Sequence, residues 1–517
     1  MVACPHAAAS AAGVDVLRAG GSAVDAAIAA ASTLGVIYPH MCGIGGDAFW
    51  LIYDAAARQV SYLDGGGRAA ASATLGRFAG QKEIPFRGIV PATLTTPGAV
   101  ASFCEAHARY GKLPLGRCLQ SAIHAARDGY EVTARLSSWI AQTAGELAQD
   151  APSAALFLLG GQAPRAGTRL ANPQLARTLE AIAGQGRAGF YEGEVAAELA
   201  KLGGFFTEHD FAAQRAHWGE PVRGSYRGVT IYETPPPTQG FTVLEMLNLV
   251  EPLELGPFHG PDHVHLLVQA KQIAYHDRDR FLADPRFVRV PIERLVSKAH
   301  AAERRAHIDP RRALAWDQVP SYGSLAGDTV YVAAVDAAGN AASLIFSLYG
   351  IFGACITSGA TGVVLQNRSA YFSLDPAHPN RLEPGKVPLH TLIASLAFKD
   401  EKLWTVLGCM GADGQPQIHL QAYVAMIDYG RDIQQALSDP RWLSGRFALG
   451  EARDTLHIEA RYPRATIDEL ERRGHLVDRW GDWNELAGHA HGISIDTDGT
   501  LRGGYDPRSD GAALLSG

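Results

Sequence analysis

The sequence predicts a layered α/β fold in which helices cover β-sheets. Strand-like runs are followed by helical runs on both sides of residue 329, which is the pattern expected of packed sheet and helix layers. The composition agrees, because 47% of the residues are hydrophobic and 19% are charged, as in well-packed α/β proteins. At 517 residues the chain exceeds the usual size of one core, so it forms several domains or one large layered unit.

Residues 7–36 carry Ala-rich helical patterns, and Ser22 is a suitable N-cap for the second of these helices. The glycines at 43–46 predict a tight turn with positive φ, and they lead into an apolar strand at 48–54. Residues 59–68 return as the second strand of a hairpin. Because the glycines lack the G-x-G-x-x-G spacing and precede a strand, the segment disfavours dinucleotide binding.

Helical patterns dominate residues 97–203, and a strand pair at 221–233 precedes further helices that continue to residue 284. Residues 308–326 form a polar segment with Pro and Gly, which predicts an exposed loop that tolerates a chain break. Strands are then expected at 330–336, 341–348, 361–367, 391–398 and 402–408, and helices at 417–430 and 465–474.

Charge and composition exclude several classes of partner. The formal net charge of −7 and the pI near 6.3 argue against binding to nucleic acid or to an anionic membrane. Six widely spaced cysteines without a C-x-x-C pair predict reduced, buried thiols. The first residues lack a basic stretch, and no run of about 18 apolar residues follows. We therefore expect a soluble cytoplasmic protein.

One motif near the middle of the chain can carry chemistry. Thr329 opens a run, TVYVAAVDAAGNAASLIFS, that reads as two strands joined by a turn. If the bond before Thr329 is cut, its hydroxyl becomes a nucleophile and its own α-amine the base. Taken alone, a Thr at this position is more simply explained as a good strand former.

Other motifs are weaker. Residues 408–415 follow a strand and precede a helix, so their backbone amides either hold an oxyanion or form an ordinary turn. His263 and His265 are spaced i,i+2 and point apart on a helix, which disfavours a shared metal. The sequence contains neither H-E-x-x-H nor G-x-S-x-G, so we expect no metal, no cofactor and no serine triad.

A series of longer strings identifies a family. The strings are GGSAVDAAIAA, YPHMCGIGGDAFWLIYD, PGAVASF, RYGKLPL, GFYEGEVA, YRGVTIYETPPPTQG, GDTVYVAAVDAAGNAASL, GVVLQN, PGKVPLHTL, GCMGADGQPQ and ALSDPRW. In this order, from about residue 2 to 510, the chain resembles the γ-glutamyltranspeptidase family of N-terminal nucleophile hydrolases. The resemblance implies a four-layer αββα sandwich and cleavage between Asp328 and Thr329. Residues 1–328 would then form a large fragment and residues 329–517 a small catalytic fragment, and the two would stay associated. The resemblance leaves open a homodimer of these heterodimers.

The resemblance also implies roles for four residues. Thr329 corresponds to the family's nucleophile in both self-cleavage and catalysis. Ser347 matches a family Thr whose hydroxyl binds the nucleophilic residue. Gly411 and Ala412 match the Gly-Gly whose N–H groups form the oxyanion hole, and Ala keeps that N–H.

The substrate-binding positions depart from the family pattern. Arg368 and Tyr371 replace the Gln and Asp that grip the substrate α-amine in glutathione-cleaving members. A cation here repels an ammonium and favours a carboxylate, although Arg368 could equally be a structural arginine.

Four further positions are expected to contact substrate. Arg68 is a shifted counterpart of the family's carboxylate-binding Arg, His390 and Thr391 replace a Ser-Ser pair, and Tyr349 replaces an Asn near the nucleophile. These changes resemble the branch that includes oxamate amidohydrolases and cephalosporin acylase-like enzymes.

The resulting hypothesis is an autoprocessing threonine amidohydrolase that cleaves a small carboxylate-bearing amide, oxamate-like or glutaryl-like, through an acyl-enzyme. One alternative is a γ-glutamyltransferase or glutathione hydrolase with altered anchors. Another is a degenerate, unprocessed member that acts as a binding protein.

Overall fold

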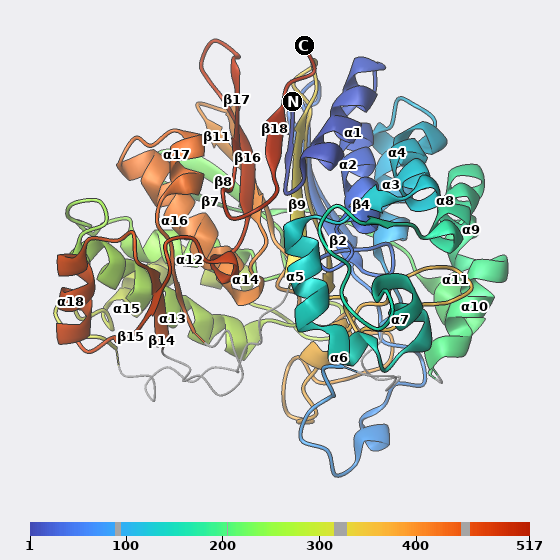
Figure 1. Ribbon diagram of the computed structural model, residues 1–517. Helices are drawn as coiled ribbons and strands as arrows, with labels where there is room; N and C mark the ends of the chain where they lie inside the picture. Colours follow the sequence, from blue (N-terminus) through green and yellow to red (C-terminus); the bar gives the residue numbers. More distant parts are fainter. Residues whose placement is uncertain (88–94, 204, 315–327, 446–454) are drawn as a thin grey trace.

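Two large β-sheets lie face to face between two layers of helices in the computed structural model (Figure 1). The structure describes residues 1–87, 95–203, 205–314, 328–445 and 455–517. The order helix, sheet, sheet, helix confirms the predicted αββα sandwich.

The described residues form one seven-stranded and one six-stranded sheet, and neighbouring strands in both run antiparallel. In spatial order the first sheet contains β18 (Ala512–Leu514), β1 (Val2–Cys4), β9 (Asp328–Val335), β10 (Ala341–Tyr349), β2 (Asp47–Asp54), β3 (Gln59–Gly65) and β6 (His217–Gly219). The second contains β17 (Leu501–Tyr505), β16 (Ala490–Ile495), β12 (Lys402–Cys409), β11 (Ala394–Lys399), β8 (Val229–Glu233) and β7 (Val222–Tyr226). Pairing of β1 with β18 brings the two chain ends together.

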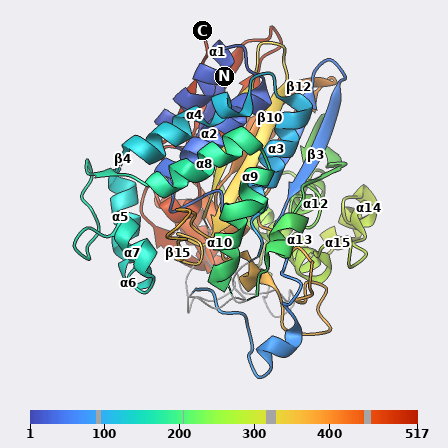
Figure 2. The same cartoon turned by 90° about the vertical axis from the view of Figure 1, so that its right-hand side faces the viewer.

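Helices cover the outer face of each sheet. The first sheet is covered by α1 (Ala7–Arg18), α2 (Ala23–Ile37), α3 (Ala99–Tyr110), α4 (Leu115–Asp128) and α8 (Pro173–Gln185), as Figure 2 shows. The second is covered by α12 (Phe241–Val250), α13 (Pro261–Phe281) and α16 (Gln415–Asp428).

Shorter elements extend these layers. The helices are α5 (Ala134–Gln142), α6 (Ala144–Leu147), α7 (Ala151–Phe157), α9 (Ala188–Tyr191), α10 (Gly193–Gly203), α11 (Glu208–Ala213), α14 (Ile292–Leu295), α15 (Lys298–Arg305), α17 (Ile433–Ser438) and α18 (Arg464–Arg472). The small sheets are β13 (Trp442–Ser444), β14 (Thr455–Glu459) and β15 (Leu476–Trp480), and the pair β4 (Tyr130–Glu131) and β5 (Arg169–Leu170).

Strand β2 shows how the sequence produces buried sheets. Successive strand residues point to opposite faces, so Phe49 and Leu51 pack between the two sheets while Trp50 and Ile52 pack under the helices. Both faces are therefore buried, which explains why this strand is a continuous apolar run without polar alternation.

The N-terminal predictions are confirmed except at the glycines. Ser22 caps α2, and its side chain and that of Asp25 bind each other's backbone N–H groups at 3.1 and 3.0 Å. The prediction of positive φ was wrong for Gly43, Gly45 and Gly46. A Cβ on Gly46 would lie 2.1 Å from the carbonyl oxygen of Ser347, so glycine is needed because two backbones approach closely.

Other predictions need correction. The expected strand at 361–367 makes only isolated bridges, such as that between Gly45 and Leu365. The C-terminal strands β16 to β18 were not predicted. Most of the expected loop at 308–326 lies outside the described residues. All six cysteines are free thiols, as predicted, and five of them are buried, whereas Cys104 is partly exposed. Among the described helices, none combines the length and apolar character needed to cross a bilayer.

Candidate active site

The buried hydroxyls of Thr329 and Ser347 meet across strands β9 and β10. Thr329 is 2% exposed, and its Oγ1 donates a hydrogen bond of 3.2 Å to Ser347 Oγ. The N–H of Tyr349 donates to the same Ser347 oxygen at 2.8 Å. The register shifts between Phe346 and Tyr349, so that Tyr349 lies opposite Asp328. The bond between Asp328 and Thr329 is therefore placed beside two ordered hydroxyls.

Arg368 forms a buried cationic centre next to these hydroxyls. Its side chain is fully buried, and it donates hydrogen bonds to Ser347 Oγ at 3.4 Å and to Thr391 Oγ1 at 3.2 Å. Its guanidinium carbon lies 4.5 Å from the ring centre of Tyr349, and the Tyr349 and Tyr371 rings lie 4.5 Å apart. Within the described residues, no carboxylate forms an ion pair with Arg368. The guanidinium is therefore held by hydroxyls and aromatic rings, and these partners leave its positive charge uncompensated by a direct ion pair.

Gly411 and Ala412 follow β12, which packs directly on β9. A Cβ on Gly408 of β12 would lie 2.3 Å from the ring of Tyr331, two residues beyond Thr329. The backbone then turns sharply, with φ of 145° at Gly411 and 48° at Ala412. A non-glycine residue in this region stores about 1 kcal/mol of strain, a feature that is common at functional sites.

Gln239 connects this turn to the Arg368 site. Its amide nitrogen donates to the carbonyl oxygens of Thr391 at 2.9 Å and Ala412 at 3.0 Å. Its amide oxygen accepts a hydrogen bond from Arg278 at 2.7 Å, and Arg278 forms an ion pair of 3.1 Å with Asp413. Sequence reasoning missed Gln239 and Arg278, whose only signal is that they are polar residues within buried segments.

His390 lies behind Arg368, against a carboxyl group that the sequence did not reveal. His390 Nε2 is 3.4 Å from Asp47 Oδ2, and both side chains are fully buried. Burial raises the pKa of Asp47 to about 7, although nearby Arg368 opposes this rise. Burial, aided by Arg368, holds the pKa of His390 well below its usual value, so this imidazole is neutral. An Asp that begins an otherwise apolar strand was the available signal.

Arg68 lies apart from this network. Its guanidinium contacts the ring of His217, the residue of β6 that lies opposite Asp64 of β3. In the described part of the chain, the Arg68 side chain forms no hydrogen bond with Thr329 or Arg368. The structure thus brings together most of the expected residues. These are Thr329, Ser347, Tyr349, Arg368, Tyr371, His390, Thr391, Gly411 and Ala412, with Asp328 in the adjoining backbone.

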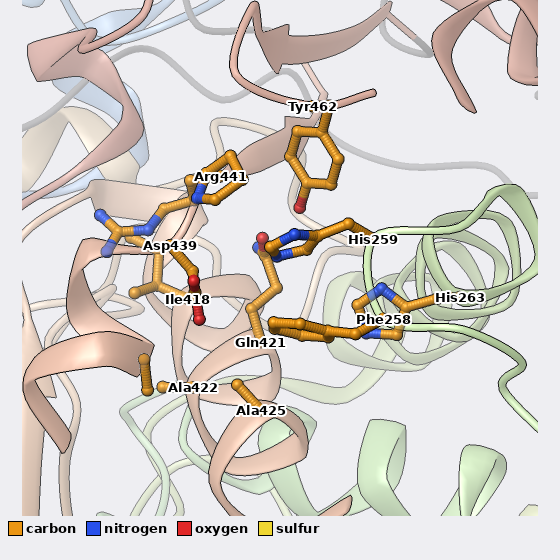
Figure 3. Close-up of a pocket in the computed structure, with 12 residues that line it drawn as sticks. Phe258, His259, His263, Ile418, Gln421, Ala422, Ala425, Asp439, Arg441 and Tyr462 are labelled. Carbon is orange, nitrogen blue, oxygen red and sulfur yellow. The ribbon is translucent and has the colours of Figure 1, made fainter. Parts of the chain in front are cut away.

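The described residues also border cavities outside the network, and two of them differ greatly in volume. The larger, of about 410 Å³, is bordered by Tyr62, Trp218 and Arg286. The smaller, shown in Figure 3, is bordered by Phe258 and His263 among others, and its volume of about 20 Å³ has room for one water molecule.

The two histidines at i,i+2 face different surroundings. His263 lines the small cavity, whereas His265 Nδ1 lies 2.7 Å from His475 Nε2. The prediction that they share no metal is consistent with this geometry.

One buried cluster has metal-ligand chemistry but holds a cation of its own. Ligand atoms of Glu245, Asp277 and His300 lie within 4.8 Å of one another. Arg304 Nε donates to Asp277 Oδ2 at 3.1 Å, so a guanidinium already compensates one carboxylate there.

Comparisons with known proteins extend over nearly the whole chain. A family model described as Gamma-glutamyltranspeptidase matches residues 9–516. The glutathione hydrolase-like YwrD proenzyme of Bacillus subtilis is 40% identical, and the alignment covers 99% of this chain and 98% of that protein. The oxamate amidohydrolase proenzyme of Klebsiella pneumoniae is 38% identical, with the same coverage of 99% and 98%. The crystal structure of cephalosporin acylase from Bacillus halodurans matches with a TM-score of 0.91 and 36% identity, covering 99% of this chain and 94% of that one.

Proposed function

The chain belongs to the γ-glutamyltranspeptidase family of amide-bond hydrolases, and we propose that it is an autoprocessing threonine amidohydrolase for small amides that carry a carboxylate. The observation that carries the proposal is Arg368. It is a fully buried cation that hydrogen-bonds to hydroxyls, and one of these, Ser347 Oγ, also accepts the hydrogen bond of Thr329.

Processing would begin with the hydroxyl of Thr329. Its Oγ1 attacks the carbonyl carbon of Asp328, the peptide C–N bond breaks, and the nitrogen takes up the proton. Water then hydrolyses the resulting ester and frees the α-amine of Thr329. The products, 1–328 and 329–517, would stay together because β9 pairs with β1 and β10 pairs with β2 across the fragments.

In turnover, the free α-amine of Thr329 takes the proton of Oγ1 as Oγ1 attacks the substrate amide carbonyl. The N–H groups of Gly411 and Ala412 would stabilise the oxyanion. The C–N bond breaks and the α-ammonium returns its proton to the leaving amine. The α-amine of Thr329 then deprotonates a water molecule, which attacks the acyl ester. The carboxylic acid product is released as Oγ1 regains a proton.

Arg368 selects the substrate class. Its guanidinium would bind the substrate carboxylate, with Thr391, His390 and the mutually tilted rings of Tyr349 and Tyr371 forming the surrounding wall. Oxamate-like and glutaryl-like amides meet this requirement, and two similar proteins carry the names oxamate amidohydrolase and cephalosporin acylase.

A γ-glutamyl substrate would need an acceptor for its α-ammonium. Asp413, which accepts a hydrogen bond from Tyr371 at 3.5 Å, already forms an ion pair of 3.1 Å with Arg278, and the cation of Arg368 would repel an ammonium. The geometry therefore favours a substrate without an ammonium group.

Product release by wild type and Thr329→Ala on oxamate, a glutaryl amide and a γ-glutamyl anilide tests the proposal. We expect wild-type protein to run as fragments of about 35 and 20 kDa, which are the shares of 1–328 and 329–517 in 55.1 kDa. It should release ammonia from a carboxylate-bearing amide, whereas Thr329→Ala stays whole and inactive. Family-like turnover of the anilide alone would contradict the proposed substrate class, and a wild-type chain that never cleaves would support a binding protein.

A further inference from the structure

We propose that Asp47 and His390 form a proton-accepting pair that sets the charge of the Arg368 site, so that a substrate carboxylate binds together with one proton. The inference rests on the proposed function, because it concerns the same anion site. It assigns a positioning role to Asp47.

The two oxygens of Asp47 have different surroundings. Oδ1 accepts hydrogen bonds from the N–H of Gly98 at 3.1 Å and from the amide nitrogen of Gln366 at 3.0 Å. Oδ2 has no such donor among the described residues and faces His390 Nε2 at 3.4 Å. Both ring nitrogens of His390 are likewise buried without another partner in the described chain. The free carboxyl oxygen and the imidazole therefore lie 3.4 Å apart in a buried site, where either of them can take up a proton.

The register of β2 places this pair beside the reacting hydroxyls. Asp47 is the first residue of β2 and lies directly opposite Ser347, whose hydroxyl contacts both Thr329 and Arg368. His390 precedes Thr391, the other hydroxyl that binds Arg368. The pair and the guanidinium thus share one buried compartment, in which charges interact far more strongly than in water.

Two protonation states follow. With one proton the pair is Asp47 carboxylate and neutral His390, and its charge of −1 compensates Arg368. With a second proton the pair is neutral and Arg368 keeps an uncompensated positive charge. A buried net charge is costly, so a substrate carboxylate can enter favourably when the pair takes up that proton.

Other groups face the same compartment. Around Asp47 and Arg368 these are Tyr191, Tyr349, Tyr371, Asp413 with its partner Arg278, and Lys271 behind them. Burial raises the pKa of all three tyrosines, so they stay neutral between pH 6 and 9. Burial lowers the pKa of Lys271 to about 7, so Lys271 could also alter anion binding in this range. A variant at Asp47 distinguishes the pH dependence caused by the Asp47–His390 pair from that caused by Lys271, because it leaves Lys271 unchanged.

The sign of the effect can be worked out. In the free site Asp47 is half protonated near pH 7, and a bound carboxylate raises its proton affinity. Substrate affinity is therefore highest below pH 7 and falls by up to about tenfold per pH unit above it. The α-amine of Thr329 titrates as the catalytic base and should act on kcat.

The test is the pH dependence of KM from pH 6 to 9, measured with the carboxylate-bearing amide that wild type hydrolyses. Asp47→Asn should remove most of the rise of KM above pH 7 while kcat keeps its own profile. Glu233→Gln is a matched control, because Glu233 of β8 and His419 of α16 are also a fully buried carboxyl–imidazole pair, 3.0 Å apart. This control should retain the wild-type rise. A flat wild-type profile, or an unchanged rise in Asp47→Asn, would overturn the inference.

A second measurement does not depend on any variant. Calorimetric binding of glutarate to processed wild type, in buffers of different ionisation enthalpy at pH 8, should show uptake of close to one proton per bound carboxylate. Binding without proton uptake overturns the inference. Failure of the proposed function looks different, because then neither amide turnover nor glutarate binding depends on Arg368.

Discussion

Thr329 donates a hydrogen bond of 3.2 Å to the hydroxyl of Ser347, and both side chains are buried between strands at the centre of the first sheet. Ser347 Oγ also receives the N–H of Tyr349 and a guanidinium N–H of Arg368. This one oxygen therefore fixes the nucleophilic hydroxyl, the bulged backbone and the anion-binding cation relative to one another.

Ser347→Ala removes that common acceptor. The donors of Tyr349 and Arg368 lose a partner in a buried site, which costs about 1–3 kcal/mol, and the Thr329 hydroxyl loses its orientation. We expect both fragment formation and kcat to fall by about 10–100-fold. Band intensities over time and single-turnover rates measure the two effects. Ser347→Thr keeps the hydroxyl and should restore most of both, and wild-type rates in Ser347→Ala would contradict the assigned role.

Substitution of Arg368 should act mainly on substrate affinity. Replacing a buried charge-assisted contact costs about 2–3 kcal/mol, so Arg368→Met should raise KM for a carboxylate-bearing amide by about 30–100-fold. The KM of Arg368→Lys should lie between those of wild type and Arg368→Met, because an ammonium keeps the charge but cannot reproduce the paired donors of a guanidinium. Steady-state kinetics on oxamate and on its uncharged ester measure this effect.

The uncharged ester is the control for that experiment. Its KM should differ little between wild type and Arg368→Met, since it offers no carboxylate to the guanidinium. Equal losses on both compounds would mean that Arg368 supports the fold of the site and does not bind the substrate.

Runs of apolar residues and local turns allowed sheets covered by helices and the strand that begins near Thr329 to be predicted, whereas the αββα order was implied by the resemblance to the family. Asp47 was not predicted, since its importance depends on pairing between β2 and β10, whose residues are about 300 positions apart in the chain. Residue type also does not show burial: an Arg such as Arg368 is usually exposed, yet here it is fully buried.

Arg68 is a second residue whose surroundings could not be read from the sequence. The resemblance placed it among the substrate anchors, but a shift of two residues along the segment after β3 directs its guanidinium to His217. Successive residues of a strand point to opposite faces of the sheet, so a shift along the chain changes which neighbours a side chain contacts. The same holds in the loop that follows the strand. Motif order was therefore enough to predict the nucleophile, whereas the surroundings of the expected specificity residues needed the three-dimensional pairing.

Gln239 offers a test of positioning without substrate contact. Its amide nitrogen holds the carbonyl oxygens of Thr391 and Ala412, so Gln239→Glu should place a carboxylate against these oxygens. We expect kcat to fall by about tenfold or more while KM changes less, because the oxyanion donors are displaced more than the anion site. Gln239→Asn keeps the amide but shortens it and should give a smaller loss. A change confined to KM would contradict the assignment to the oxyanion turn.

The burial of His263 predicts that the folded protein loses stability as the pH falls. This side chain lies beside the small cavity in Figure 3, is 2% exposed, and packs against the rings of Phe258 and Tyr429 at 5.2 and 5.3 Å. Burial lowers the pKa of His263 from 6.5 to about 3. Between these values the unfolded chain binds more protons than the folded one, so stability is full above pH 6.5 and is lost as the pH falls. At pH 5 the loss amounts to about 2 kcal/mol.

His263→Phe should remove this contribution, since an aromatic ring of similar shape fits the same neighbours without a proton to gain. Thermal unfolding at pH 7.5 and pH 5.0 measures the effect. The difference between the two midpoints should be smaller in His263→Phe than in wild type, whereas His124→Gln, at an exposed position of α4, should keep the wild-type difference. If both variants show the wild-type difference, His263 is solvated in the folded protein and its neighbours in Figure 3 do not exclude water.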